Sequence, residues 1–594
     1  MFQNFEVKAR PEQGPPRLAA LRTALKAAGV GGFLVPRADA YQGEYVAPCD
    51  SRLEWLTGFT GSAGFAAVLP KIAGVFVDGR YRLQARAQVD TDAFAQVDWP
   101  EVRLGDWLRD HARDGARIGF DPWLHTVEEI AQLRKALAGH ADLVPLTENP
   151  IDEIWDDRPA PPQSAAFAYP EELAGRSASE KRESCAASLT QTGETAVILT
   201  QPDAICWLLN IRGADLPRIP VVQAMAVLHG SGQLDLFADP NKFEEVNLGP
   251  GVQLYPPHAF IPALNALDGG VRIDPKTAPQ AVSDALAKPI HGPDPCALPR
   301  ACKTHSEIEG ARAAHLRDGA AVCEFLAWVD EQTPGAFTEI DVVRALEGFR
   351  RETGALRDIS FETIAGAGPH GAIVHYRVTE ETDRAVNAGE LLLVDSGGQY
   401  LDGTTDITRT IAIGRPTHEM QVAYTRVLQG MIAISRARWP EGLSGRDLDP
   451  LARIHLWMAG QDYDHGTGHG VGAYLSVHEG PQRISRASEV PLRPGMIVSN
   501  EPGYYREGAF GIRIENLVVV EPAPVIDGAD SKRRMLSFET LTWAPLDRRL
   551  ILSDLLSRAE IAWIDSYHEQ VRGKIGPSLG KRAQLWLNEA SAPL

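Results

Sequence analysis

The chain has 594 residues, of which 44% are hydrophobic, and its formal net charge is −19. This length exceeds what one hydrophobic core usually supports, so several domains are expected. A protein this acidic repels phosphate backbones and anionic lipid, which argues against a nucleic-acid partner. Its apolar runs are all shorter than the about 20 residues of a membrane helix, so no membrane partner is expected either.

The six cysteines form no CxxC pair and no tight framework. In a chain of this size, that pattern favours reduced thiols and hence a reducing compartment. The N-terminal segment MFQNFEVKARPEQGPP is charged and broken by proline, unlike the apolar core of a signal peptide. We therefore expect a cytoplasmic protein.

Short apolar segments alternate with helix-like segments in the first part of the chain. Residues 32–36, 64–69 and 74–77 are apolar runs bounded by turn residues, which predicts three strands. Residues 81–89 have helical character. Alternation of this kind is typical of an α/β domain.

This pattern has an echo further along the chain. The segment LEWLTGFTG at residues 53–61 resembles ICWLLNIRG at residues 205–213, and each precedes a strand-rich stretch. The proline-rich segment at residues 157–162 lies between them. We expect two related α/β domains, residues 1–155 and 156–298. Chance similarity of two short windows is the alternative.

A second break, PDPCALP at residues 293–299, precedes a long helical pattern. Ser306 and Glu309 fit a capping box at the start of this helix. Its apolar face carries Ala314, Ala321, Phe325 and Leu326. The helix opens a third domain, which holds nearly all the residues of chemical interest.

The first candidate site residues in this domain are two aspartates. The apolar run LLLV leads into Asp395, and the chain returns through Asp406 into the apolar stretch at residues 407–413. A carboxylate at the end of an apolar strand is costly to bury unless a cation or a donor compensates it. Two such aspartates on neighbouring strands favour a cation site. A turn aspartate followed by a capping aspartate is the alternative.

Three of the 16 histidines lie close together in the sequence: His465, His469 and His478. Glycines on both sides of His469 allow the backbone to approach a bound group closely. A lone histidine is more often a satisfied structural residue. Three histidines spaced by glycines instead favour a metal ligand with acid–base neighbours.

Two glutamates complete the set. Glu501 follows the apolar run at residues 496–498, and Glu515 precedes the run at residues 517–520. Arg513 and Glu515 are two residues apart, so on a strand they would share a face. This spacing predicts that Arg513 holds a metal-binding carboxylate in place.

Together these segments supply two aspartates, two glutamates and one histidine. Four carboxylates around one imidazole suit hard divalent ions such as Mn²⁺, and without cations they would repel one another. Two ions roughly 3.5–4 Å apart would balance the charge, hold a hydroxide and polarise a carbonyl. The residues themselves thus indicate two-metal hydrolysis.

These residues resemble the ligand signature of the pita-bread metallopeptidases, which include methionine aminopeptidase, prolidase and aminopeptidase P. The ordered set is Asp395, Asp406, His469, Glu501 and Glu515. The strings HGTGHGVG, VHEGP, EPGYY, GIRIEN and GAIVHY are most similar to aminopeptidase P. DAYQGEYVAPCD and DGRY resemble the first domain of its long form, so the resemblance covers essentially the whole chain.

The resemblance implies an α/β and α+β multidomain fold. Two creatinase-N-like α/β domains would precede a C-terminal pita-bread catalytic domain, residues 299–540, whose curved antiparallel sheet carries the metals. Residues 541–594 would form a C-terminal extension packed on the catalytic domain. Family precedent also implies a homodimer.

The implied activity is that of a metal-dependent aminopeptidase acting on peptides with a penultimate proline. The five ligands would hold two divalent ions, Mn²⁺ foremost, with Zn²⁺ or Co²⁺ as alternatives. Glu501 would also accept the proton of a water that bridges the ions. His375 and His478 would orient the scissile carbonyl and stabilise the oxyanion.

The same resemblance implies four substrate-binding residues: Arg80, His375, His465 and His478. For Arg80 the alternative is an exposed turn arginine, and for His465 it is support of His469. Two other functions remain open. A prolidase shares the ligands but is restricted to dipeptides, and some pita-bread proteins are non-catalytic binding scaffolds that have lost their ligands.

Overall fold

The computed structural model describes every residue except 531, and the chain divides into two compact units. The N-terminal unit is Lys8–Ala297. The C-terminal unit is Leu298–Leu594 together with Met1–Val7. The first seven residues therefore pack with a unit whose other residues follow about 290 positions later.

The N-terminal unit begins with a mixed six-stranded sheet of order β4-β3-β2-β1-β5-β6. Its strands and helices match the predicted alternation, because β1, β2, β3 and α3 fall on the four segments expected from the sequence. The strands are β1 (Gly32–Pro36), β2 (Phe65–Val68), β3 (Ala73–Val77), β4 (Ala95–Asp98), β5 (Ala116–Phe120) and β6 (Ala141–Pro145). The helices are α1 (Gly14–Ala27), α2 (Arg52–Thr57), α3 (Arg82–Gln88), α4 (Leu104–His111) and α5 (Val127–Leu137).

A second sheet in this unit repeats the first, with order β12-β11-β10-β8-β13-β14. In each sheet the central strand pairs antiparallel with one neighbour and parallel with the other. Trp55 lies in α2 and Trp207 in α8, and each helix follows the central strand of its own sheet. The prediction of two related domains is thus confirmed.

The elements of the second domain surround this sheet. Its strands are β7 (Phe167–Ala168), β8 (Ala196–Leu199), β9 (Ile211–Arg212), β10 (Met225–His229), β11 (Leu234–Phe237), β12 (Val252–Tyr255), β13 (Val271–Ile273) and β14 (Pro289–His291). Its helices are α6 (Glu171–Ala174), α7 (Ala178–Thr192), α8 (Pro202–Leu209), α9 (Phe260–Asn265) and α10 (Gln280–Asp284). All four residues of β8 are buried, as expected for a strand covered on both faces.

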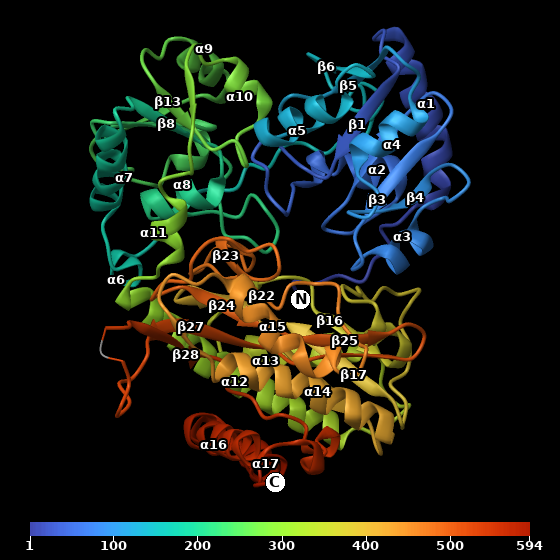
Figure 1. Cartoon of the computed structure of the whole chain (residues 1–594), viewed down its shortest axis with the longest axis vertical. Helices are drawn as coiled ribbons and strands as arrows, with labels where there is room; N and C mark the ends of the chain where they lie inside the picture. The colour runs from blue at the N-terminus through green and yellow to red at the C-terminus, as the bar shows by residue number, and fades with distance from the viewer. Residues whose placement is uncertain (531) are drawn as a thin grey trace. The chain divides into compact units, whose positions relative to one another are not determined.

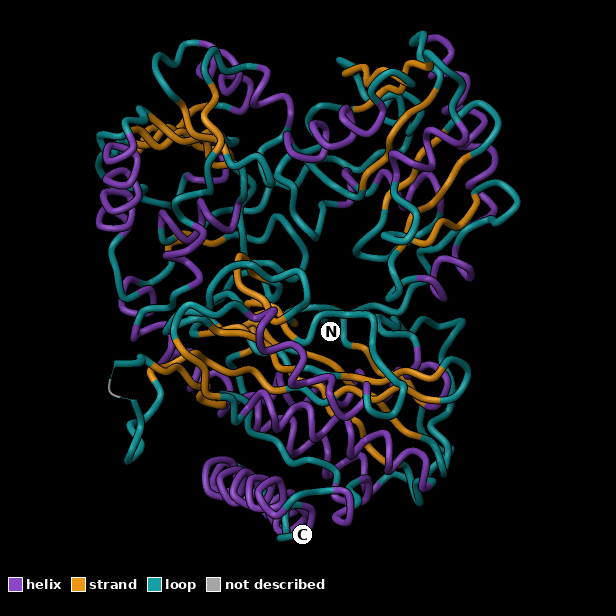
Figure 2. The backbone as a smooth tube through the Cα atoms, in the orientation of Figure 1, coloured by secondary structure: helices purple, strands orange, loops and turns teal. Residues whose placement is uncertain are grey.

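Helices and antiparallel strands form the C-terminal unit (Figures 1 and 2). The helices are α11 (Ala297–Ala301), α12 (His305–Glu331), α13 (Glu339–Glu352), α14 (His418–Ser435), α15 (Gly445–Trp457), α16 (Arg558–Ile575) and α17 (Lys581–Ala590). The last two contact α12. None of the helices in the described part of the chain has the length and apolarity needed to cross a bilayer.

The capping box predicted for the start of α12 is wrong. The helix begins at His305, and the Thr304 side chain accepts from the backbone of Glu307, whose carboxylate accepts from the backbone of Thr304. The overlapping pairs Thr304–Glu307 and Ser306–Glu309 both fit the capping pattern. Thr304 caps because it is the residue with extended backbone, φ −66° and ψ 166°. The predicted apolar face of α12 is buried.

The strands of this unit pair antiparallel throughout the described residues, in a six-stranded sheet of order β21-β28-β27-β24-β22-β23 and several smaller sheets. One smaller sheet has the order β16-β17-β20. The strands are β15 (Leu356–Ile359), β16 (Ile364–Ala367), β17 (Leu391–Ser396), β18 (Gly398–Tyr400), β19 (Gly403–Thr404), β20 (Ile407–Ala412), β21 (Arg438–Pro440), β22 (Gly468–Gly470), β23 (Glu479–Ile484), β24 (Ile497–Asn500), β25 (Gly503–Arg506), β26 (Phe510–Arg513), β27 (Asn516–Pro522) and β28 (Met535–Thr540).

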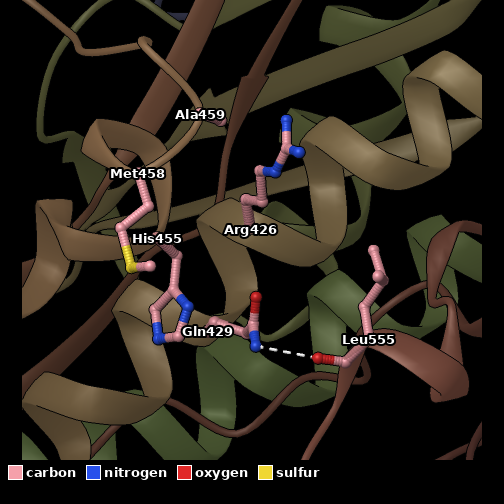
Figure 3. Close-up of a pocket in the computed structure, with 6 residues that line it drawn as sticks. All are labelled: Arg426, Gln429, His455, Met458, Ala459 and Leu555. Atoms are coloured by element: carbon pink, nitrogen blue, oxygen red, sulfur yellow. Dashed lines mark hydrogen bonds between the residues drawn. The ribbon is translucent and has the colours of Figure 1, made fainter.

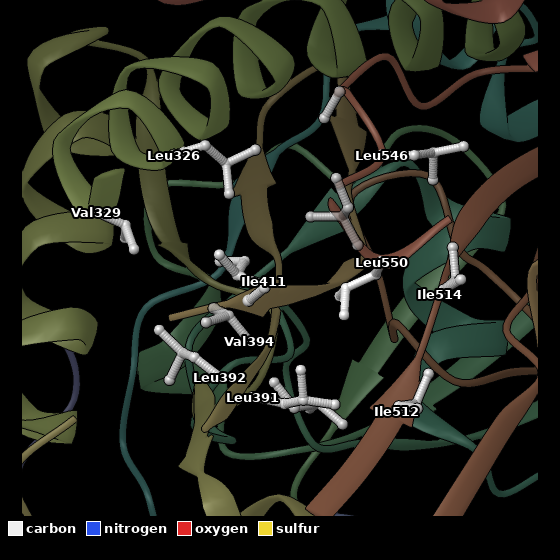
Figure 4. Packing of buried hydrophobic residues seen from close by; sticks show 14 of the residues in the cluster. Leu326, Val329, Leu391, Leu392, Val394, Ile411, Ile512, Ile514, Leu546 and Leu550 are labelled. Atoms are coloured by element: carbon white, nitrogen blue, oxygen red, sulfur yellow. The ribbon is translucent and has the colours of Figure 1, made fainter. Parts of the chain in front are cut away.

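One large apolar cluster packs against strands β17 and β20. Figure 4 shows Leu392 and Val394 of β17 close to Ile411 of β20, within one cluster that also includes Leu326 of α12. Leu550, from the segment beyond residue 540, belongs to the same cluster. The end of β17 is therefore anchored on a closely packed base, which restricts where its last residues lie.

Candidate metal centre

Five side chains, each in or beside a different strand of the C-terminal unit, converge. Asp395 is the penultimate residue of β17, Asp406 directly precedes β20, His469 lies in β22, Glu501 directly follows β24 and Glu515 directly precedes β27. Ligand atoms of Asp395, Asp406 and Glu515 lie within 4.8 Å of one another, and so do those of His469, Glu501 and Glu515. The structure thus brings together all five residues predicted as metal ligands.

Strand β20 fixes two of the carboxylates. Asp395 is paired with Thr408 across the β17–β20 ladder. The Thr408 hydroxyl donates to Oε2 of Glu515 at 2.8 Å, and the backbone N–H of Glu515 donates to the Thr408 carbonyl at 3.1 Å. Thr408 therefore sets the distance between Asp395 and Glu515.

Strand β24 fixes the other side of the centre. The Ser499 hydroxyl donates to Oε1 of Glu501 at 3.0 Å and accepts from the backbone of His469 at 2.9 Å. Nδ1 of His469 lies 3.0 Å from the Gly470 carbonyl, which can only accept. Nε2 of His469 therefore faces the carboxylates, 3.5 Å from Asp406 and 3.4 Å from Glu501.

Glycines flanking His469 serve close packing between strands. A Cβ at Gly468 would lie 1.9 Å from the Ser499 carbonyl, and one at Gly470 would lie 2.3 Å from the Glu479 carbonyl. The sequence interpretation assigned these glycines to the approach of a bound group. The structure adds a second reason for these glycines, which is close approach to the neighbouring strands.

Burial and mutual repulsion raise the pKa of three carboxylates in the cluster: Asp395, Glu501 and Glu515. Burial raises the pKa of Asp395 to about 7, with Asp406 and Glu501 adding to the shift and Arg513 opposing it. Burial, reinforced by the other three carboxylates, raises the pKa of Glu515 well above its usual range. Burial also works against a charged His469, but Asp406 and Glu501 raise its pKa to about 9. Without cations, protons have to offset the concentrated negative charge.

The donor set fits two divalent cations. Three buried carboxylate oxygens have no hydrogen-bond partner among the described residues: Oδ1 of Asp395, Oδ1 of Asp406 and Oε1 of Glu515. Buried polar atoms are normally paired, so these oxygens are available to a ligand that contributes positive charge. Four carboxylates and one imidazole form an oxygen-rich site suited to Mn²⁺-like ions.

Arg513 is the cation that the fold itself supplies. Its guanidinium donates to Oδ2 of Asp395 at 2.6 Å and to the hydroxyl of Tyr505 at 2.5 Å. Arg513 ends β26 and Glu515 lies beyond it, before β27. The two are thus not on one strand, and the carboxylate that Arg513 contacts is Asp395.

The four residues predicted to bind substrate lie in separate segments of the chain. The ring of His478 contacts that of His469 edge-on, with centroids 4.3 Å apart, and His478 can join Asp406 and His469 in a ligand group. Nε2 of His465 lies 2.9 Å from the Tyr505 hydroxyl. His375 is half-buried in the loop that follows β16. Arg80 belongs to the N-terminal unit.

Arg80 and Asp78 form an ion pair at 2.6 Å in the turn after β3. Three residues that support the centre were not predicted: Thr408, Ser499 and Tyr505. The string EPGYY contains Tyr505, and Thr408 is two positions from Asp406, so both lie beside predicted residues. Their contacts depend on pairing between strands that are distant in sequence.

Family models match almost the entire chain. Metallopeptidase family M24 matches residues 309–522, and the C-terminal region of this peptidase family matches residues 534–594. The Creatinase/Prolidase N-terminal domain matches twice, at residues 17–154 and residues 157–307. With the convergent carboxylates, these matches define a metallopeptidase of family M24 and confirm the expected fold class.

Curated relatives narrow the family further. The chain is 37% identical to aminopeptidase P2 of Arabidopsis thaliana, covering 97% of this chain and 88% of the relative. It is 39% identical to a probable Xaa-Pro aminopeptidase P of Laccaria bicolor, covering 97% of this chain and 93% of the relative. The chain belongs to the aminopeptidase P family, the metal-dependent Xaa-Pro aminopeptidases.

A comparison with solved structures supports the same family assignment. An X-prolyl aminopeptidase from Caenorhabditis elegans, described as a cytosolic enzyme with a di-nuclear active site, is 32% identical with a TM-score of 0.92, covering 98% of this chain and 99% of that one. A prolidase from Pyrococcus horikoshii, 24% identical with a TM-score of 0.51, covers only 62% of this chain and 99% of its own. That prolidase shares the fold of part of the chain.

Proposed function

We propose that this protein releases the N-terminal residue from peptides whose second residue is proline. The convergence of four carboxylates and one imidazole, in a chain related over nearly its full length to Xaa-Pro aminopeptidases, carries the proposal. A prolidase is the second candidate, and the prolidase similarity over only 62% of the chain weighs against it. The scaffold alternative requires lost ligands, whereas all five ligand types remain.

Within this proposal, Asp395, Asp406, His469, Glu501 and Glu515 hold two divalent ions, of which Mn²⁺ is the one we propose. When bound, the ions supply Lewis-acid activation of the scissile carbonyl and of the attacking water. The orphaned carboxylate oxygens support this assignment. Reconstitution of stripped protein with Mn²⁺, Zn²⁺ or Co²⁺ tests it. The highest kcat/KM at cellular concentrations should belong to Mn²⁺.

The chain's own groups perform the proton transfers and orient the substrate. Glu501 accepts the proton of the attacking water, and its bond from Ser499 keeps one oxygen in place for this role. His478 and His375 donate to the carbonyl oxygen as it gains negative charge. The X–Pro amide has no N–H, so recognition of the scissile bond relies on these donors to its carbonyl.

Two further contacts are proposed for the substrate. Arg80 of the N-terminal unit binds the peptide chain, and its pair with Asp78 keeps the guanidinium oriented. His465 contacts the proline ring, supported by the hydroxyl of Tyr505. Variants Arg80→Ala and His465→Ala should raise KM for tripeptides more than they lower kcat.

The decisive assay uses metal-stripped protein, with and without Mn²⁺, on Arg-Pro-Pro and on the dipeptide Ala-Pro. Metal-dependent release of arginine, with Ala-Pro poorly cut, supports the proposal. Cleavage of Ala-Pro alone indicates a prolidase. Cleavage of neither peptide by folded, metal-loaded protein supports the scaffold alternative.

We also propose a homodimer formed through the exposed face of α15. Four apolar side chains near its end are 39–83% exposed: Leu451, Ile454, Trp457 and Met458. A hollow of about 230 Å³ lies beside them, between Met458 and Leu555 (Figure 3). Ile454→Glu should convert a dimer into a monomer in light scattering. Val102→Glu, at an exposed valine of the other unit, is the matched control.

A cytoplasmic location is proposed for the protein. The six cysteines are all free, which suits a reducing compartment, and the related enzyme of Caenorhabditis elegans is described as cytosolic. Cell fractionation with an antibody against the protein tests this. Enrichment in a membrane or secreted fraction would contradict it.

A further inference from the structure

The first seven residues form an extended strap on the C-terminal unit, although the sequence gives them no catalytic motif. Phe5 is buried, in the same apolar cluster as Tyr376 and Val378. Gln3 is buried as well. A segment without helix or strand that is buried at two positions is held by specific contacts, and these contacts fall on one functional region.

One end of the strap fixes the entry to β16. The side chain of Gln3 accepts from the backbone N–H of Thr363 at 2.7 Å and donates to its carbonyl at 3.3 Å. The buried carboxylate of Glu347 in α13 accepts from the backbone N–H of Phe2 at 2.8 Å. Thr363 directly precedes β16, which pairs with β17 so that Ile364 is opposite Asp395.

The other end of the strap fixes the chain directly after His375. The guanidinium of Arg377 donates to the backbone carbonyls of Asn4 and Glu6 at 2.9 and 3.0 Å. The backbone N–H of Glu380 donates to the Phe5 carbonyl at 2.9 Å. The strap thus spans both ends of the segment at residues 363–380, which contains His375.

The residues before and after His375 are held by different parts of the C-terminal unit. On its N-terminal side, the Val374 carbonyl accepts from Arg513 at 3.3 Å, and Arg513 also donates to Asp395. On its C-terminal side, the hydroxyl of Tyr376 donates to Glu339, and Arg377 reaches the strap. A loop residue without helix or strand of its own depends on such flanking anchors for its orientation.

We propose that the strap, through Phe5 and the backbone carbonyls that Arg377 binds, positions His375 for catalysis. The strap acts as a positioning element and does not touch the substrate. The proposal rests on the role proposed above for His375. Because that role is to stabilise charge that develops in the transition state, loss of the strap should lower kcat and leave KM little changed.

The test uses the metal-loaded chain without residues 1–7, assayed on Arg-Pro-Pro. We expect kcat to fall at least tenfold, KM to change less than threefold, and metal content to stay at two ions. A synthetic peptide of residues 1–7 added in trans should restore kcat. The same peptide with Phe5→Ala should fail, and the peptide with Glu6→Ala, which alters only an exposed side chain, should succeed.

A double-mutant cycle separates positioning from general support. In a His375→Ala background, removal of the strap should lower kcat less than twofold further. A loss as large as in the wild-type background would overturn the proposal, and so would full kcat in the deletion variant. Phe5→Ala and Arg377→Ala in the full chain must show the same kcat loss, and these variants decide the matter where the deletion variant does not fold.

Hydrogen exchange provides a readout that does not depend on catalysis. Without the strap, amides at residues 373–380 should exchange faster, while those of β17 keep their protection. An inactive wild-type protein would refute the proposed function, but the exchange difference would still test whether the strap orders the His375 loop. Unchanged exchange at residues 373–380 would refute the positioning role.

Discussion

Arg409 joins the metal-binding strands to the C-terminal extension, and its replacement by methionine tests how much that connection contributes. The buried guanidinium donates to four backbone carbonyls and two side chains. The acceptors are the carbonyls of Thr408, Glu515, Ala544 and Pro545, Oδ1 of Asn516 and the hydroxyl of Tyr567, at 2.6 to 3.0 Å. None of these six acceptors is a carboxylate.

The expected cost follows from the acceptors left behind. Each buried carbonyl that loses its donor costs roughly 1–3 kcal/mol, and four backbone carbonyls lose this donor. Relief of the burial of the charge offsets part of this sum. We therefore expect Arg409→Met to lower the free energy of unfolding of the C-terminal unit by about 3–5 kcal/mol, although methionine fills similar space.

Calorimetry at fixed metal concentration measures this loss. At roughly 2–4 °C per kcal/mol, the unfolding transition should fall by at least about 6 °C, and amides of α16 should lose protection because Tyr567 loses one of its hydrogen-bond partners. Arg317→Met is the control, because Arg317 forms a more exposed pair with Asp402 and such pairs contribute about 1 kcal/mol or less. A shift for Arg409→Met no larger than for the control would refute this reasoning.

Three other predictions concern acid stability and metal binding. Burial lowers the pKa of His568 to about 3 in the folded chain, so stability present above pH 6.5 should fall by about 2 kcal/mol on acidification to pH 5. In pH-dependent calorimetry, His568→Gln should lack that part of the acid slope. Arg513→Lys removes the planar guanidinium that orients the carboxylate of Asp395. This substitution should weaken metal binding about 10–100-fold in equilibrium dialysis. Gly468→Ala would place a methyl against the Ser499 carbonyl and should reduce bound metal at least tenfold, whereas Gly348→Ala, in open space, should not.

Local patterns in the sequence pointed to the four carboxylates and to a group of three histidines, and the family resemblance then selected His469 among them. Each lies beside an apolar strand or among glycines, so its chemistry is visible within a few residues. The repeat of the two N-terminal domains was equally accessible, because Trp55 and Trp207 occupy equivalent helices. Each of these patterns spans only a few residues, so it can be recognised without knowing the order of strands in the sheets.

Features that depend on distant pairing could not be predicted. The contact of Arg513 with Asp395 joins strands more than a hundred residues apart, so sequence spacing pointed to Glu515 instead. The cap at Thr304 was missed because two overlapping pairs fit the same pattern, and only the backbone conformation separates them. Phe5 offers no sequence signal that its side chain belongs to the same buried cluster as Tyr376.

The position of the strap also has a consequence for biosynthesis. Its residues are made before both α/β domains, yet Glu347, which binds Phe2, follows 345 positions later. At 5–20 residues per second, the N-terminus waits roughly 17–70 s for its binding surface to be made. Meanwhile the intervening domains can fold, while the side chains of Phe2 and Phe5 lack their binding surface. Docking of residues 1–7 therefore reports that a segment some 345 positions further along the chain has been made and has folded.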